Sequence, residues 1–149
     1  MAFYNISREE MNEFLEPQGF QKMILPGVVE LVYGKIVYHG SHRLSMRIYT
    51  AINPTGESRE KGSDAIRLQM YWLYDGNPIP VGCPQKCLRV PNWRANMKAA
   101  IERCVSNDKY AACPVCSSPM AIRHRRTDNQ EFWACSVWFN TGCRGIRGR

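Results

Sequence analysis

Apolar and polar residues alternate with the two-residue period of a β-strand over much of the first 108 residues. In residues 43–52 this alternation places Leu44, Met46 and Ile48 on one side, and arginine, serine and tyrosine on the other. Such a period indicates strands that bury one face and pair antiparallel through short turns. Four segments are expected to be strands: residues 28–39, 43–52, 64–74 and 79–90, the last broken at Cys83 and Pro84.

Two further segments repeat their apolar residues with the 3.6-residue period of a helix. The first follows Ser7, a residue type suited to an N-cap, and ends at Pro17. The second spans residues 93–105, with Asn92 as its N-cap. The fold class predicted for this part is α+β: a small antiparallel sheet with two flanking helices on one face, while the other face stays open.

The composition is that of a protein with a packed core. The chain has 149 residues, of which 44% are hydrophobic. Its apolar stretches are interrupted well before the roughly 18–20 residues that a membrane helix needs. The first residues are acidic and lack the basic and then apolar pattern of a secretory signal. We therefore expect a cytoplasmic protein without membrane contact, whose seven cysteines stay reduced.

Positive charge is concentrated in the last quarter of the chain. The formal net charge is +7, and residues 113–149 hold six arginines and two acidic residues, a net charge of +4. The planar guanidinium of arginine suits phosphate and stacks on bases. This shift predicts two domains, residues 1–108 and 109–149. The alternative is a basic tail that only increases solubility.

Four of the seven cysteines lie in this tail with the spacing of a metal site. Cys113 and Cys116 form a CPVC knuckle; 18 residues separate Cys116 from Cys135, and 7 separate Cys135 from Cys143. Two such pairs facing each other supply four thiolates to one tetrahedral ion. A redox Cys-x-x-Cys motif normally opens a helix, whereas two serines and a proline follow here. The spacing predicts a four-cysteine zinc ribbon with one structural Zn²⁺.

The segment CPVCSSPMAIRHRR…FWACSVWFNTGCRGIR resembles the four-cysteine zinc finger (zinc ribbon) repeated at the C-termini of bacterial type IA DNA topoisomerases. The shared features are the CPxC knuckle, the Pro-Met turn, a basic strand, the aromatic-x-Cys-Ser element and the closing cysteine. The similarity covers about a quarter of the chain, which is too short to hold the catalytic core. It implies a module that binds DNA, largely single-stranded, without strand passage.

Proteins bind single strands through basic groups that contact phosphates and aromatic rings that stack on bases. In the tail the expected nucleic-acid-binding residues are Arg123, Arg125, Arg126, Trp133, Trp138, Phe139, Arg144 and Arg147, with Arg123 and Arg125 on one face of a strand. Of the neighbours Phe132 and Trp133, one is expected in the ribbon core, and the pattern leaves open which. On the open sheet face and its adjoining loop the candidates are Arg43, Arg47, Arg59, Lys61 and Arg67, and an ordinary solvated face is the alternative.

These features predict a non-catalytic nucleic-acid-binding protein, for single-stranded DNA in repair, recombination or replication. Residues 46–72 are similar, at the level of fold, to small uncharacterised bacterial and phage DNA-processing proteins. One alternative is a metal-dependent nuclease built on Glu30, His39, His42 and Asp64. Another is an accessory subunit that docks onto a larger DNA- or RNA-processing complex.

Three cysteines lie outside the tail: Cys83, Cys87 and Cys104. Cys83-x-x-x-Cys87 has a spacing that permits half of a second metal site. Cysteines outside such sites are commonly small, buried apolar residues, and both interpretations stay open at this stage.

Overall fold

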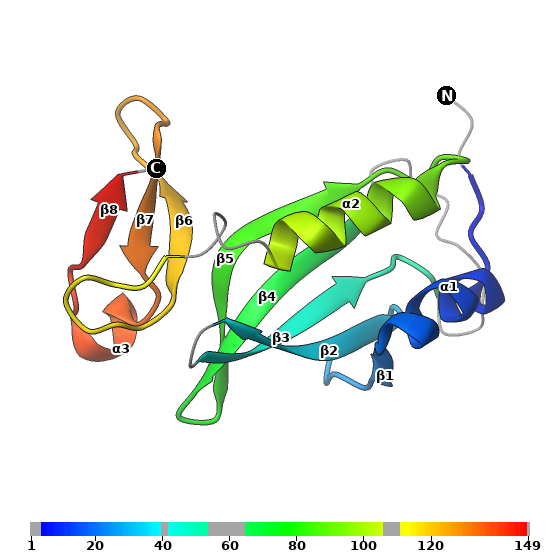
Figure 1. The fold of residues 1–149 in the computed structure, drawn as a ribbon, viewed down its shortest axis with the longest axis horizontal. Coiled ribbons are helices and arrows are strands. Elements are labelled where there is room, and N and C mark those ends of the chain that lie inside the picture. The colour runs from blue at the N-terminus through cyan, green and yellow to red at the C-terminus, as the bar shows by residue number, and fades with distance from the viewer. Residues whose placement is uncertain (1–3, 40–41, 54–64, 106–110, 149) are drawn as a thin grey trace.

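The computed structural model describes residues 4–39, 42–53, 65–105 and 111–148 (Figure 1). It is a mixed α+β fold in which eight strands follow one another in chain order across the sheet. The strands are β1 (Gln21–Met23), β2 (Val32–His39), β3 (His42–Tyr49), β4 (Ile66–Tyr74), β5 (Asn77–Cys87), β6 (Met120–His124), β7 (Glu131–Cys135) and β8 (Ile146–Gly148). The helices are α1 (Arg8–Leu15), the 3₁₀ turn η1 (Glu16–Gln18), α2 (Trp93–Val105) and α3 (Trp138–Thr141).

Helix α1 begins and ends as the sequence predicts. The Oγ of Ser7 accepts a hydrogen bond from the backbone N–H of Glu10 at 3.1 Å, and Glu10 Oε1 accepts one from the backbone N–H of Ser7 at 3.4 Å. This capping box satisfies backbone donors that lack an intrahelical partner in the first turn. The chain leaves through Pro17 in η1 and through Gly19, whose φ of +90° favours glycine.

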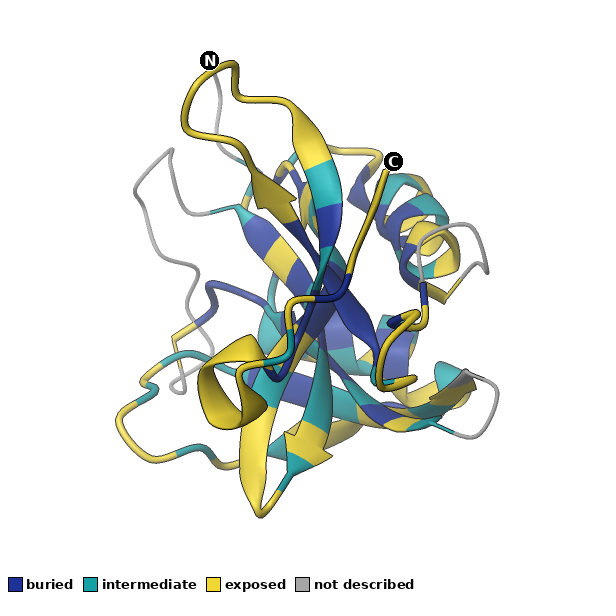
Figure 2. Ribbon diagram, turned by 90° about the vertical axis from the view of Figure 1, so that its left-hand side faces the viewer, coloured by how far each residue is buried: buried dark blue, intermediate teal, exposed yellow. Residues whose placement is uncertain are grey.

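Strands β2 to β5 form antiparallel pairs, and their residues alternate between a buried and a more exposed side. Met46 of β3 pairs with Met70 of β4, and Ile48 pairs with Leu68; all four are buried. The alternation of buried and exposed positions along the strands is visible in Figure 2. The strand period read from the sequence is therefore confirmed for β3 and β4.

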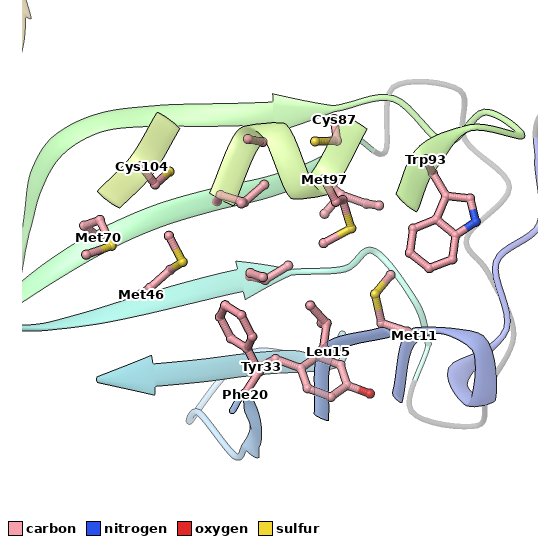
Figure 3. Close-up of a cluster of buried hydrophobic side chains, with 14 of the residues drawn as sticks. Met11, Leu15, Phe20, Tyr33, Met46, Met70, Cys87, Trp93, Met97 and Cys104 are labelled. Atoms are coloured by element: carbon pink, nitrogen blue, oxygen red, sulfur yellow. The ribbon is translucent and has the colours of Figure 1, made fainter. Parts of the chain in front are cut away.

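Both long helices pack on the same side of these strands (Figure 3). Met11 and Leu15 come from α1, and Trp93 and Met97 come from α2; all four are fully buried in the core. Helix α2, with 13 residues, is the longest helix described. Among the described residues, no helix combines the length and apolar character required to cross a membrane.

The sheet is larger and more continuous than the predicted small sheet followed by a separate ribbon. β5 continues through Cys83 and Pro84, but its register against β4 shifts there: Leu68 pairs with Gln85 and Met70 with Val81, so residues 82–84 form a bulge where the sequence predicts a break. β6 then joins β5 through a parallel pairing of Gly82 with Ala121. Independent folding of residues 1–108 and 109–149 stays a prediction, and the chain between them, residues 106–110, lies outside the described residues.

Leu68→Ala should destabilise the fold strongly, because Leu68 is fully buried between the sheet and the helices. Truncating such a residue costs about 2–5 kcal/mol in the free energy of unfolding. Leu88→Ala is the matched control, since Leu88 is 57% exposed. Its loss in the free energy of unfolding should stay within about 0.5 kcal/mol. Urea unfolding measures both variants, and equal losses would contradict the placement of the core.

Candidate metal centre and nucleic-acid interface

The four cysteines of the tail converge on one point. Cys113 and Cys116 lie on the turn before β6, Cys135 ends β7, and Cys143 follows α3. Their sulfur atoms all lie within 4.8 Å of one another. The Sγ atoms of Cys113 and Cys143 are 3.7 Å apart, and those of Cys116 and Cys135 are 3.5 Å apart.

These distances fit one tetrahedral zinc ion. Zn–S bonds of about 2.3 Å in tetrahedral geometry place the sulfur atoms about 3.8 Å from each other. A site with four thiolate ligands leaves no open position for water or substrate, so such a site is structural. The cluster is therefore consistent with one structural Zn²⁺, bound by the four cysteines that the sequence predicts.

The backbone of the first knuckle is shaped around the Cys113 sulfur. The backbone N–H of Val115 donates to Cys113 Sγ at 3.4 Å. The N–H of Ser117 donates to the carbonyl of Cys113, and the N–H of Cys113 donates to the carbonyl of Ser118, both at 2.8 Å. Because these bonds hold the turn closed, both thiols of the Cys-x-x-Cys pair face the same point.

The second half of the site requires two glycines. Gly142, which precedes Cys143, has a φ of +74°, and Gly145 passes close to the sulfur of Cys113. A Cβ at Gly145 would lie 2.1 Å from that sulfur. The carbonyl of Gly145 also accepts a hydrogen bond from the N–H of Cys135 at 3.0 Å, so β8 is attached next to a ligand.

Local groups change the acidity of the thiols. The hydroxyl of Ser118 lies 3.3 Å from Cys116 Sγ, and the hydrogen bond between the two side chains lowers the pKa of Cys116 to about 6. Burial raises the pKa of Cys135. Because zinc binds thiolates, binding must release the proton from Cys135, and metal affinity falls as the pH falls.

The aromatic residues of the ribbon separate into a core set and a surface set. Trp133 is only 6% exposed and belongs to the small core that includes Met120 and Ile122. Little of its ring is open to a base there, so this burial argues against the stacking role that the sequence predicts for Trp133. Trp138 and Phe139 of α3 are 47% and 83% exposed, and their rings meet edge to face at 4.4 Å.

Phe132, the neighbour of Trp133, lines a pocket on the opposite face of the ribbon sheet. The pocket has a volume of about 260 Å³ and is also lined by Arg123, Trp138, Phe139 and Ile146. The sequence left open whether Phe132 or Trp133 is exposed, and it gave no indication of Ile146 as a site residue. Alternation along β7 puts Phe132 and Trp133 on opposite faces but does not indicate which face is buried.

The ribbon arginines are all exposed among the described residues, but they do not share one face. Arg123 lies on β6 and lines the pocket. Arg125 was expected on the same face, but β6 ends at His124, and Arg125 bonds Gln130 Oε1 at 2.9 Å within the following turn. The remaining described arginines of the ribbon lie on turns or on the edge strand: Arg126, Arg144 and Arg147.

The candidate arginines of the first part are partly engaged with neighbouring side chains. Arg47 stacks over the ring of Tyr71 at 4.4 Å, and Arg67 lies over the ring of Tyr49 at 5.2 Å. Arg67 also forms an ion pair with Glu30, which largely neutralises it. Arg43 is exposed at the start of β3. The candidates Arg59 and Lys61 lie outside the described residues.

The described residues of the nuclease alternative, Glu30, His39 and His42, do not come together. Glu30 precedes β2, whereas His39 ends it and pairs with His42 across the hairpin; the intervening strand is about 23 Å long. Glu30 bonds Arg67 and the N–H of Ala51, and the ring of His42 packs edge-on against Trp72 at 5.8 Å. Asp64 lies outside the described residues.

The remaining cysteines do not form a second metal site within the part of the chain that is described. Cys87 and Cys104 are buried in the main core, and burial raises the pKa of Cys104 to about 12. Cys83 packs against the ribbon core. Cys87 and Cys104 therefore act as small apolar core residues.

Comparisons of the chain with protein-family models, with curated proteins and with solved structures give no match. The cysteine cluster is compatible with a zinc ribbon, and the similarity to topoisomerase zinc fingers rests on the motifs of the tail alone. The function is therefore argued from the geometry of the site.

Gly145→Ala should weaken zinc binding, because the new Cβ would displace the Cys113 sulfur. A change in the residues that position a metal ligand typically lowers metal affinity by about 10–100-fold. Gly148→Ala on the same strand is the control, since nothing lies within 4 Å of the added Cβ. Competition with a chromogenic chelator measures both affinities, and metal analysis should find one zinc per wild-type chain. Equal affinities in the two variants would contradict the site.

Proposed function

We propose that the protein binds single-stranded DNA through its zinc ribbon, without catalysis, in DNA repair, recombination or replication. The observation that carries this proposal is the pocket of about 260 Å³ on the ribbon, where the rings of Phe132, Trp138 and Phe139 meet the guanidinium-bearing side chain of Arg123. Aromatic rings beside a cation are the elements with which proteins bind single strands: the rings stack on bases, and the cation contacts phosphate.

The exposure of the α3 rings supports a binding role. Two adjacent large aromatic side chains, one of them 83% exposed, form an apolar surface that a folded protein normally covers unless it binds something. Other apolar side chains of the ribbon form a packed core: Met120, Ile122 and Trp133 are buried. Trp138 and Phe139 lie outside this core and remain available to a ligand.

The charges around the pocket favour a polyanion. The acidic side chains of the ribbon are engaged: Asp128 lies 3.9 Å from Arg125, and Glu131 lies 3.5 Å from His124. The other arginines give the ribbon its positive potential.

The closed four-thiolate geometry argues for a structural metal and therefore for binding rather than reaction. Thiolate ligands also favour a reducing compartment such as the cytoplasm.

Phe139→Ala should weaken the binding of a labelled 25-nucleotide oligo(dT) strand, because it removes the most exposed ring of the pocket. The loss of one stacked base corresponds to about 1–3 kcal/mol, or roughly 5–150-fold in affinity. Val115→Ala is the control: Val115 is 73% exposed on the same ribbon but does not line the pocket. Fluorescence anisotropy measures both variants on the full, zinc-loaded chain.

The same assay tests the class of ligand. The proposal requires tighter binding of single-stranded DNA than of duplex DNA or RNA, with an affinity that falls steeply as salt rises. Weak binding of all three with little salt dependence would contradict it and would favour a ribbon that docks onto another protein. Equal losses in Phe139→Ala and Val115→Ala would contradict the stacking role.

A further inference from the structure

The outer face of the sheet, meaning the side of β2, β3 and β4 that points away from α1 and α2, carries several arginines, and the carboxylate of Glu30, which precedes β2, reaches it only in an ion pair with Arg67. These three strands contain no aspartate or glutamate. The pairing register places Arg47 and Tyr49 on this face, next to Gln69 and Arg67, while the intervening residues are buried beneath the helices. The acidic residues of α1 lie on the helix side, so the two sides of the sheet differ in charge.

The cations of this face are not equivalent. Arg67 is paired with Glu30 and offers little net charge. Arg47 is fixed by its stack on Tyr71, yet its Nε is buried and has no hydrogen-bond partner among the described residues. A guanidinium held in place in this way forms strong, charge-assisted hydrogen bonds when an anion binds. Arg43, on the same face of β3, is exposed.

Two adjoining depressions make this face a groove. The first has a volume of about 150 Å³ and the second about 480 Å³, and Ile36 and Ser45 line both. No acidic residue lines either of them. Arg43 and Arg47 line the first part. Lys22 and Lys35 border the second part, but they pair with Tyr33 and Met46 and therefore point to the helix side of the sheet.

The side chains between these cations select among polyanions. Ile36 is 44% exposed, Tyr38 is 68% exposed, and Tyr71 lines the first depression. An acidic peptide would satisfy the charges but would leave the aromatic and apolar side chains uncovered. A single nucleic-acid strand alternates phosphates with flat bases and sugars, and so it complements both kinds of side chain.

We propose that this outer-face groove is a second binding track for single-stranded DNA, in which Arg43 and Arg47 contact phosphates and Arg67 takes no part. The inference rests on the proposed function for the identity of the strand, but every residue that carries it lies outside the zinc ribbon. A strand that reaches both surfaces gains phosphate contacts from each, and each such contact adds to the salt dependence of binding.

The test is the double variant Arg43→Gln/Arg47→Gln in the full, zinc-loaded chain. The matched control is Lys98→Gln/Arg103→Gln, which removes the same charge from the exposed side of α2. Binding of the 25-nucleotide oligo(dT) strand is measured by anisotropy across a salt series. Each lost phosphate contact lowers the slope of log K against log[salt] by about 0.7 and the affinity at 0.1 M salt by about fivefold. The double variant should therefore lose about 1.4 in slope and bind about 25-fold more weakly, while the control stays close to wild type.

The outcomes separate this inference from the proposed function. If Phe139→Ala weakens binding and Arg43→Gln/Arg47→Gln does not, the groove is wrong and the ribbon proposal stands. If only the groove variant weakens binding, the groove is supported and the ribbon proposal is contradicted. Equal losses in the groove variant and the α2 control indicate an unspecific effect of net charge and overturn the inference. Should the double variant unfold, Arg43→Gln alone, at an exposed position, must still lower the slope by about 0.7.

Discussion

Four thiolates within reach of one ion are the constraint on which the last quarter of the chain depends. The ribbon core is small, and its main apolar members are Met120, Ile122, Trp133 and Val137. A core of this size cannot by itself offset the entropy of ordering three strands. Structural zinc in small domains contributes about 10–16 kcal/mol, which is enough to hold such a ribbon. Ser117 has a positive φ, which is unfavourable for a residue other than glycine. This conformation closes the turn that directs the sulfur atoms toward one point.

The same constraint determines what the ribbon exposes. Cys135 ends β7, and Cys143 must return to within 4.8 Å of it, so the seven residues between them leave the sheet and form α3. The core face of β6 and β7 is occupied by packing against Tyr74 and Ile79 of the β4–β5 hairpin. The pocket therefore forms on the opposite face, where Phe132 meets the rings of α3. A structural metal thus positions the surface that we propose for stacking.

In the larger part of the molecule, the layering of the fold places helix α1 and the arginines of β3 and β4 on opposite sides of the sheet. Both helices cover one face of β2 to β5, and the acidic residues of the protein's first helix lie with them. The other face keeps its arginines beside tyrosines, where stacking restricts the guanidinium of Arg47. Restricting a cation before a ligand arrives lowers the entropy lost on binding. The zinc ribbon and the sheet would then offer two surfaces of similar chemistry by different structural means.

Features set by short stretches of chain were predictable from the sequence. The capping box at Ser7, the alternation of β3 and the cysteine spacing that predicts the metal cluster each depend on residues whose geometry follows from local backbone periods and turn lengths. The continuity of β5 with the ribbon through Gly82 and Ala121, the burial of Trp133 rather than Phe132, and the neutralisation of Arg67 by Glu30 were decided only by the tertiary structure. Each of these depends on residues that are distant in sequence, and only the packing of one element on another determines which face is covered and which charge finds a partner.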